Sequence, residues 1–389
     1  FKLGYLLFDI MKSKDKQNIS NDILLSLPLE LRHNLDIGKN KLLYEEKLIS
    51  KFDMSELSYE KRINLMNTND YIKNKAINKL KSIKNNIQGD NKSQSWLDGL
   101  LKIPFGIYNE NNIMNMKTQF IKKIKQVYAD CENLYSFNDL NNFITKLDTN
   151  NDIYIEWNQY KKDRFDYLKN VEIKLDNAVY GHIEAKTQLK RLFAQWINGE
   201  SKGEILGLHG PPGTGKTSLA KKGLSQCLAD NNGKNRPFAF LPIGGSTNGS
   251  TLVGHNYTYV GSTWGRIVDI LMVSGCMNPI IFIDELDKIS NTENGREISS
   301  ILTHLTDLTQ NEHFEDKYFA GIPFDLSKAL IIFSFNDITQ IDPILKDRIT
   351  IIETKPFTIE EKIHILQNYM LPEIFKEIGF NNNEIIFSF

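Results

Sequence analysis

An eight-residue glycine loop, Gly210-Pro-Pro-Gly-Thr-Gly-Lys-Thr217, constrains the fold of this 389-residue chain more than any other feature. It follows the apolar run Glu204-Ile-Leu-Gly-Leu-His209 and precedes an apolar-periodic stretch from Lys216 to about Ala229, so we expect a strand, the loop and a helix in that order. Glycines in such a loop allow successive backbone N–H groups to point inward and hold phosphate oxygens at the helix N-terminus. The pattern therefore predicts a nucleotide-binding α/β domain.

Two side chains of the loop could also contact the nucleotide and its metal ion. The ammonium group of Lys216 would reach the β- and γ-phosphates of ATP, and the hydroxyl of Thr217 would bind Mg²⁺. A chance glycine-rich turn is the alternative, and the flanking strand and helix argue against it. The residues expected to contact ATP here are Gly210, Pro211, Pro212, Gly213, Thr214, Gly215, Lys216, Thr217 and Ser218.

Two carboxylates end a second apolar run, Ile280-Ile-Phe-Ile-Asp-Glu285. A strand buried on both faces would deliver Asp284 to the C-terminal edge of a parallel sheet, where ligands bind and where it could hold Mg²⁺ through water. Glu285 could act as the base that polarises the attacking water. Alone, such a run could be a solvated strand end, but together with Lys216 and Thr217 it predicts ATP hydrolysis.

Two polar residues further along have two interpretations each. Asn336, which ends Phe333-Ser-Phe-Asn336, could orient the attacking water between the glycine loop and Glu285, or it could begin a turn, the commonest role of Asn-Asp. Arg348 could pair locally with Asp347 or Asp342, or it could reach the γ-phosphate held by a neighbouring subunit. Spacing alone leaves these alternatives open.

Strands and helices alternate from about residue 175 onward. The short apolar segments expected as strands are 204–209, 237–243, 280–283, 329–333 and 349–352, with helical segments at about 265–275 and 295–308. This alternation predicts a parallel five-stranded sheet with crossover helices. After Pro356 an amphipathic run from Ile359 to about Ile378 begins a helical appendix.

The first half of the chain, up to about residue 174, has few glycines and apolar residues at helical spacing. One stripe comprises Ile72, Ala76, Leu80, Ile83 and Ile87, and another comprises Phe120, Ile121, Ile124, Val127 and Tyr128. We interpret the lysines around the second stripe as its solvated face and not as a nucleic-acid site. These lysines are Lys117, Lys122, Lys123 and Lys125.

Composition excludes several classes of protein. The 47 basic and 48 acidic residues give a net charge of −1, which excludes attraction of the whole chain to nucleic acid or an anionic membrane. Cys131, Cys227 and Cys276 match neither a disulfide framework nor a zinc site, and no apolar run reaches the roughly 18–20 residues of a membrane helix. We therefore expect a reducing, cytoplasmic location. The chain begins at Phe1 and not at Met, so we interpret it as a fragment, and organellar targeting stays open.

With these elements in this order, the chain resembles the AAA+ ATPases, and in detail the Lon protease family. The stretches that carry the resemblance are Asp176–His182, Gly254–Gly261, Asp284–Lys288, Ile322–Ser327 and Pro343–Ile349, and, ahead of them, Trp96–Phe105. The resemblance implies an α/β fold, an AAA+ P-loop NTPase core with a parallel five-stranded sheet, preceded by an all-α N-terminal region. The implied domains are a helical Lon-like region at 1–105, a helical insertion at 106–174, the ATPase core at 175–356 and the start of a helical lid at 357–389.

The resemblance also implies roles for single residues. Tyr180 and Gly181 would lie near the adenine, Tyr259 and Val260 would grip substrate in a central pore, and Arg348 would act as an arginine finger in trans. The segment from Phe314 to Phe319 would form a second pore loop. Asn256-Tyr257 replaces a basic pair of the family, so the grip on substrate or the subunit contacts would differ.

The activity implied by the resemblance is Mg²⁺-dependent ATP hydrolysis that unfolds and translocates unfolded or tagged protein substrates through a homo-oligomeric ring, a hexamer in this family. Such a motor would belong to an ATP-dependent protease or a protein quality-control machine, although no Ser-Lys peptidase domain lies within these 389 residues. Two alternatives are a clamp-loader-like or helicase-like remodeller of nucleic-acid complexes and a nucleotide-gated scaffold. The first would call for basic pore loops, whereas Asn256, Tyr257 and Tyr259 are polar or aromatic.

Overall fold

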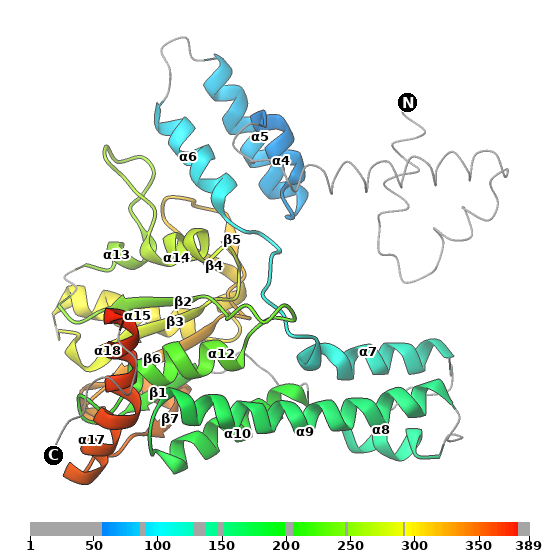
Figure 1. Ribbon diagram of the computed structural model, residues 1–389. Coiled ribbons are helices and arrows are strands. Elements are labelled where there is room, and N and C mark those ends of the chain that lie inside the picture. The colour runs from blue at the N-terminus through cyan, green and yellow to red at the C-terminus, as the bar shows by residue number, and fades with distance from the viewer. Residues whose placement is uncertain are drawn as a thin grey trace. The chain divides into compact units, whose positions relative to one another are not determined.

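The computed structural model describes residues 57–85, 91–127, 137–146, 151–198, 205–245, 248–290 and 292–379. The chain divides into two units, of which the first ends at Met66 and contributes helix α4 (Tyr59–Leu65). All other described elements belong to the second unit (Figure 1). Ile87, Tyr128 and Cys131 lie outside the described residues.

A five-stranded parallel sheet forms the centre of the second unit, which confirms the predicted fold class. Its strands are β1 (Ile205–His209), β2 (Phe238–Pro242), β3 (Ile280–Asp284), β6 (Leu330–Phe335) and β7 (Thr350–Glu353). Their order across the sheet is β2-β3-β6-β1-β7. Because the side chains of β3 and β6 are buried on both faces, these strands appear in the sequence as continuous apolar runs. Their C-terminal ends meet the end of β1 at one edge of the sheet.

Helices cover both faces of this sheet (Figure 1). One face packs in a single core cluster against α9 (Asp152–Ala178), α10 (Ile183–Ile197) and the helix that follows the glycine loop. That helix comprises α11 (Lys216–Ser218), a π-helical turn η2 (Leu219–Leu224) and α12 (Ser225–Cys227), so the predicted helix is confirmed as far as Cys227. On the opposite side lie α13 (Ser250–Val253), α14 (Arg266–Ser274) and α15 (Glu293–Thr306). Helix α16 (Pro343–Arg348) packs against α15.

A small antiparallel hairpin, β4 (Phe314–Glu315) with β5 (Pro323–Phe324), was absent from the sequence prediction. The segment 314–319, predicted as a second pore loop, thus begins with a strand, and its aromatic side chains are core residues. Its role as a pore loop stays a prediction. Phe319 is fully buried and packs against Trp96 and Trp264. Three short 3₁₀ turns complete the core, η3 (Leu286–Lys288), η4 (Asn311–His313) and η5 (Ile338–Gln340).

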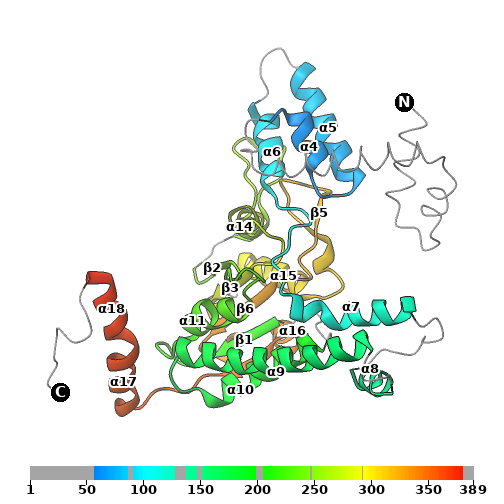
Figure 2. The same ribbon diagram turned by 45° about the vertical axis from the view of Figure 1, so that its right-hand side comes forward.

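The helices that precede the core have the apolar stripes that the sequence predicted. Helix α5 (Asp70–Asn85) buries Ile72, Ala76 and Leu80, and it packs against α6 (Asn91–Lys102). Helices α7 (Asn112–Val127) and α8 (Phe137–Ile144) pack beside the first half of α9 around Trp157 and Tyr160 (Figure 2).

One lysine of α7 contradicts the predicted solvated face. Lys117 is buried. Its Nζ donates a hydrogen bond of 2.6 Å to the backbone carbonyl of Asn198 at the C-terminal end of α10. A cation placed at the carbonyl end of a helix is favourable. Lys122, Lys123 and Lys125 are exposed, in agreement with the prediction.

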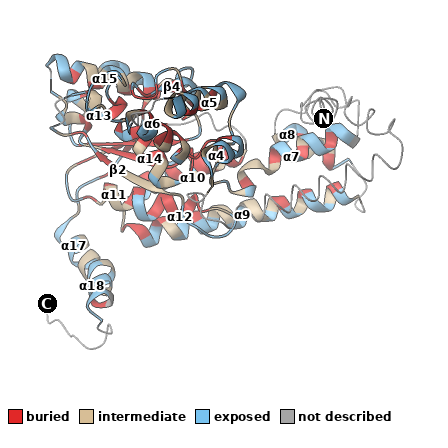
Figure 3. Ribbon diagram, turned by 90° about the horizontal axis from the view of Figure 1, so that it is seen from above, coloured by how far each residue is buried: buried red, intermediate tan, exposed pale blue. Residues whose placement is uncertain are grey.

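Helix α9 crosses the boundary predicted between residues 174 and 175. Its first half, with Trp157 and Tyr160, belongs to the cluster formed with α7 and α8, and its last turns, with Val171 and Leu175, belong to the core cluster around the sheet. The buried residues of this helix lie towards its two ends (Figure 3), at Ile153, Trp157 and Tyr160 and again at Val171, Leu175 and Ala178. The insertion and the core therefore share one continuous 27-residue helix.

The chain after β7 continues as α17 (Ile359–Ile365), a π-helical turn η6 (Leu366–Met370) and α18 (Leu371–Ile378), as far as the helical prediction extended. Thr358 begins this run with a capping box, in which its hydroxyl accepts from the amide of Glu361 and the Glu361 carboxylate accepts from the amide of Thr358. None of the helices in the described ranges combines the length and the apolar character that crossing a lipid bilayer requires.

Candidate active site

The glycine loop adopts a backbone that only glycine tolerates easily. Gly213 and Gly215 have φ values of 78° and 81°, and at Gly210 a Cβ atom would lie 2.2 Å from the carbonyl oxygen of Thr354. The amides of Gly213, Thr214 and Gly215 donate no hydrogen bond to any residue within the described ranges. The loop thus offers a row of available N–H groups that fits a phosphate chain.

Lys216 is buried at the centre of the site, with 8% of its surface exposed. Its Nζ donates hydrogen bonds to the carbonyl oxygens of Gly210 and Pro211 and one of 2.8 Å to Oδ1 of Asn336. Burial lowers the pKa of this ammonium group, and the charges of Asp284 and Asp287 act in the opposite direction. The structure therefore brings together two predicted catalytic residues, Lys216 and Asn336, that are 120 positions apart in the sequence.

Asp284 ends β3 beside this lysine, and Thr217 lies in the first turn of the helix that follows the loop. A hydroxyl and a carboxylate, completed by phosphate oxygens and water, are the ligands that Mg²⁺ takes in nucleotide sites. Thr217 is half-buried and its hydroxyl makes no hydrogen bond to the described part of the chain. The side chains present therefore fit Mg²⁺ bound together with ATP. No group of three or more His, Cys, Asp or Glu residues is placed to hold a metal without nucleotide, as far as the structure describes the chain.

Glu285 is exposed and has a left-handed backbone conformation, with φ of 60°. For a non-glycine residue this conformation is costly, and such residues occur often at functional sites. The carboxylate lies directly against Gly244, because a Cβ atom on Gly244 would lie only 1.9 Å from Glu285 Oε2. Gly244 therefore leaves the space that the Glu285 side chain occupies.

Replacing Gly244 by alanine is expected to lower kcat for ATP hydrolysis by roughly 10- to 100-fold, because the new methyl group would displace the carboxylate of Glu285, the predicted base. ATP affinity is expected to stay unchanged, because the substitution does not touch the glycine loop. Steady-state ATPase rates and fluorescent-nucleotide titration would measure both. The control is Thr251→Ala in the same connection. An unchanged kcat would show that Glu285 does not act from this position.

Asp287 is a site residue that the sequence prediction missed. Its Oδ2 accepts hydrogen bonds of 3.1 Å from the amides of both Asn336 and Asp337, so it ties the end of β6 to the turn after β3. Its other carboxylate oxygen, Oδ1, is buried without a hydrogen-bond partner in the described chain. The available signal in the sequence was its position three residues after Asp284, at the end of the same apolar run.

The segment before α10 contacts both the glycine loop and the lid. His182, another residue that the prediction missed, places Nε2 2.8 Å from the carbonyl oxygen of Thr214, and burial lowers its pKa. The ring of Tyr180 packs against His364 of α17, with centroids 4.3 Å apart. Tyr180 and Gly181 thus lie between the loop and the lid, and their contact with adenine stays a prediction.

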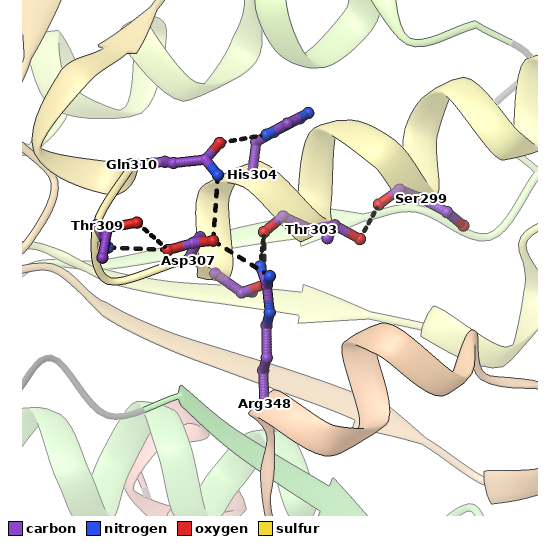
Figure 4. A network of polar contacts seen from close by, with 8 residues as sticks. Ser299, Thr303, His304, Asp307, Thr309, Gln310 and Arg348 are labelled. Atoms are coloured by element: carbon purple, nitrogen blue, oxygen red, sulfur yellow. Dashed lines mark hydrogen bonds and ion pairs between the residues drawn. The ribbon is translucent and has the colours of Figure 1, made fainter.

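Arg348 does not pair with either of the partners considered from sequence. Its guanidinium donates to the carbonyl oxygen of Thr303 and lies 3.2 Å from Asp307 Oδ2, both at the end of α15 (Figure 4). Asp307 also accepts hydrogen bonds from Thr309 and Gln310. The bonds from the hydroxyl and amide of Thr309, with the positive charge of Arg348, lower the pKa of Asp307. Asp342 instead caps α16. The arginine is therefore held at a fixed place, with about a third of its side chain exposed.

Tyr259 and Val260 form the tip of a loop between α13 and α14, away from the nucleotide residues in sequence. Tyr259 is 63% exposed and Val260 is fully exposed. Gly254 and Gly261, with φ of 75° and 76°, flank the tip. Both side chains are therefore accessible, and their role in gripping substrate stays a prediction.

Comparison with known proteins shows which family the sheet domain resembles. Residues 206–357 match the model of the ATPase family associated with various cellular activities (AAA). The Lon protease homolog of Acanthamoeba polyphaga mimivirus is 33% identical over 387 residues, which cover 98% of this chain and 33% of that protein. The Lon protease of Lawsonia intracellularis is 37% identical over 235 residues, covering 60% of this chain and 27% of that protein.

The mitochondrial Lon protease homolog of Yarrowia lipolytica is 37% identical over 229 residues, covering 59% of this chain and 19% of that protein. The chain thus spans a third or less of the length of these relatives.

Proposed function

Residues 206–357 form the AAA domain of a Lon-type AAA+ ATPase module, and we propose that this module uses Mg²⁺-dependent ATP hydrolysis to unfold and translocate polypeptide. The observation that carries the proposal is the hydrogen bond of 2.8 Å between Lys216 and Asn336. It joins the phosphate-binding loop to the end of β6, the place where an attacking water must be oriented.

Each of the site residues would have a separate role in hydrolysis. The loop amides and Lys216 would hold and neutralise the phosphates, while Thr217 and Asp284 would hold Mg²⁺, which supplies further charge neutralisation. Glu285 would take the proton of the attacking water, and Asn336 would orient that water. Asp287 would keep Asn336 in place through its two amide hydrogen bonds.

The site is incomplete without a second copy of the chain if Arg348 acts in trans. The guanidinium lies on the α15–α16 side of the core and bonds to Thr303 and Asp307, whereas the nucleotide residues of the same chain surround Lys216. A ring, a hexamer as in the family, would place this arginine at the γ-phosphate bound by the neighbouring subunit. Hydrolysis would then depend on assembly.

The cargo proposed for this motor is unfolded or tagged protein. Tyr259 and Val260 would grip a polypeptide by aromatic and aliphatic contact, which suits chemically varied sequences. The relatives are named Lon proteases, so we propose that the module serves an ATP-dependent protease or a protein quality-control machine. The location proposed for this work is the cytoplasm.

ATPase stimulation tests this proposal. An unfolded polypeptide, such as reduced and carboxymethylated lysozyme, is expected to raise the ATPase rate, and single-stranded DNA is not. Tyr259→Ala is expected to lose the stimulation and keep the basal rate, whereas the neighbouring control Thr258→Ala retains both. Stimulation by DNA alone would indicate a nucleic-acid remodeller, and stimulation by neither would indicate a scaffold. Either result would contradict the proposal.

A further inference from the structure

The loop that carries Tyr259 and Val260 has a base fixed to the ATPase core. The amide of His255 donates to the carbonyl oxygen of Thr263, which closes the loop. The amide of Gly265, just after the loop, donates a hydrogen bond of 2.7 Å to the buried carboxylate of Asp316. These contacts hold the ends of the loop and do not reach its tip.

One core residue does reach the tip, because the ring of Tyr318 packs edge-on against Tyr257 with centroids 5.4 Å apart. The tip is held further by the helices α5 and α6. Three of their side chains converge on Tyr257, two residues before Tyr259. Lys79 Nζ lies 3.9 Å from the centre of the Tyr257 ring and Lys92 Nζ lies 4.8 Å from it. The hydroxyls of Ser93 and Tyr257 are 3.2 Å apart. Lys92 also donates a hydrogen bond of 2.6 Å to the carbonyl oxygen of Tyr259 itself.

The two helices are themselves attached to the core, so they can act as a fixed support. Lys75 Nζ donates hydrogen bonds to the carbonyl oxygens of Ala320 and Gly321, at 3.2 and 3.0 Å. Trp96 Nε1 donates one to the carbonyl oxygen of Tyr318. At Gly99 a Cβ atom would lie only 3.0 Å from the Trp264 ring, so α6 approaches the core closely.

The chemistry at Tyr257 explains the direction of its side chain. An ammonium group is attracted to the face of an aromatic ring, and the attraction grows when the groups are shielded from water. Lys79, Lys92 and Tyr257 are all half-buried, and no carboxylate within the described ranges forms an ion pair with either lysine. Tyr257 therefore points to the helices, while Tyr259 and Val260 remain exposed.

We infer that Tyr257 is a positioning residue, through which Lys79 and Lys92 hold the substrate-gripping loop at a set place and thereby determine its affinity for polypeptide. The inference rests on the proposed function, because it assigns the role of gripping to Tyr259 and Val260. It adds that the helices before the core take part in the grip without any contact with substrate. Loss of the contacts between these lysines and Tyr257 would lower the affinity for polypeptide and leave the rate of ATP hydrolysis without polypeptide unchanged.

Substitutions of Tyr257, Lys79 and Lys92 test this inference. For each variant of the full chain, the ATPase rate is measured at increasing concentrations of carboxymethylated lysozyme. Tyr257→Leu is expected to raise KM for the polypeptide roughly three- to tenfold, the factor that loss of such ring contacts gives. The basal and maximal rates are expected to remain those of the wild type. Lys79→Gln and Lys92→Gln are expected to raise KM in the same direction by less, because each removes one of two cations.

Two variants separate positioning from a general loss of structure. Tyr257→Phe keeps the ring face, so it is expected to retain the wild-type KM. Lys81→Gln, an exposed position on the same helix that does not contact the loop, is the matched control. Hydrogen exchange at the amide of Tyr259, which donates to the carbonyl oxygen of Asn256, is expected to become faster in Tyr257→Leu and not in Lys81→Gln.

Three outcomes would overturn the inference while the wild type is stimulated by polypeptide. They are an unchanged KM in Tyr257→Leu, a basal rate that falls as much as the stimulated rate, and a Tyr257→Phe variant as impaired as Tyr257→Leu. The last would show that the hydroxyl contact with Ser93, and not the lysines, anchors the loop. A wild type that polypeptide does not stimulate would contradict the proposed function instead, so the two failures are distinguishable.

Discussion

Replacing Glu285 by glutamine is expected to lower kcat for ATP hydrolysis by roughly 10²- to 10⁴-fold, the contribution of a positioned general base. Glutamine has nearly the same shape as glutamate, but its amide cannot accept the proton of the attacking water. ATP binding is expected to persist, because Lys216 and the loop amides are untouched. Single-turnover hydrolysis and nucleotide titration of the same preparation would separate the two effects.

Glu293→Gln is the matched control for this variant, since Glu293 is an exposed glutamate in the first turn of α15. It is expected to hydrolyse ATP at the wild-type rate. A Glu285→Gln variant that retained the wild-type kcat would remove Glu285 from the role of base. A variant that lost ATP binding would instead show that the carboxylate contributes to the nucleotide site itself.

Replacing Arg348 by alanine is expected to lower kcat by about 10³- to 10⁵-fold, the range that arginine fingers contribute to phosphoryl transfer. The loss would arise because the guanidinium no longer neutralises charge on the γ-phosphate in the neighbouring subunit. Lys346→Ala removes an exposed cation of the same helix and is expected to be silent. Asp307→Asn removes the ion pair within the chain but keeps the arginine, so it is expected to cost much less activity.

Mixing two inactive variants distinguishes action in trans from action in cis. A Glu285→Gln subunit keeps Arg348 and could activate the intact site of an Arg348→Ala neighbour. Mixed assemblies of the two are therefore expected to regain part of the ATPase activity that neither has alone. If mixing restores no activity although both variants assemble, Arg348 does not act on a neighbouring subunit.

The sequence predicted the sheet and the centre of the site because these depend on local patterns. Lys216, Asp284 and Asn336 each follow a strand or a loop whose apolar residues identify it, and parallel strands bring their C-terminal ends to one edge. The direct bond between Lys216 and Asn336 follows from β1 and β6 being neighbours. The strand order itself could not be read from the sequence with the same certainty as the strands.

Contacts between distant segments could not be predicted, since no local pattern encodes them. Arg348 pairs with Asp307, 41 positions away, although acidic residues lie much nearer in the sequence. Lys117 appeared to be one of four solvated lysines, yet it reaches the end of α10. Likewise, the aromatic residues near Phe319 look like an exposed loop until the positions of Trp96 and Trp264 are known.

Helix α9 has a mechanical consequence. Its 27 residues extend over about 40 Å, and its C-terminal half, from Tyr167 onward, is packed against the core. A rotation of five degrees at that end would displace the far end, with Trp157 and the helices packed around it, by roughly 3 Å. A small rotation of the helix about its last turns would thus be enlarged at its distant end.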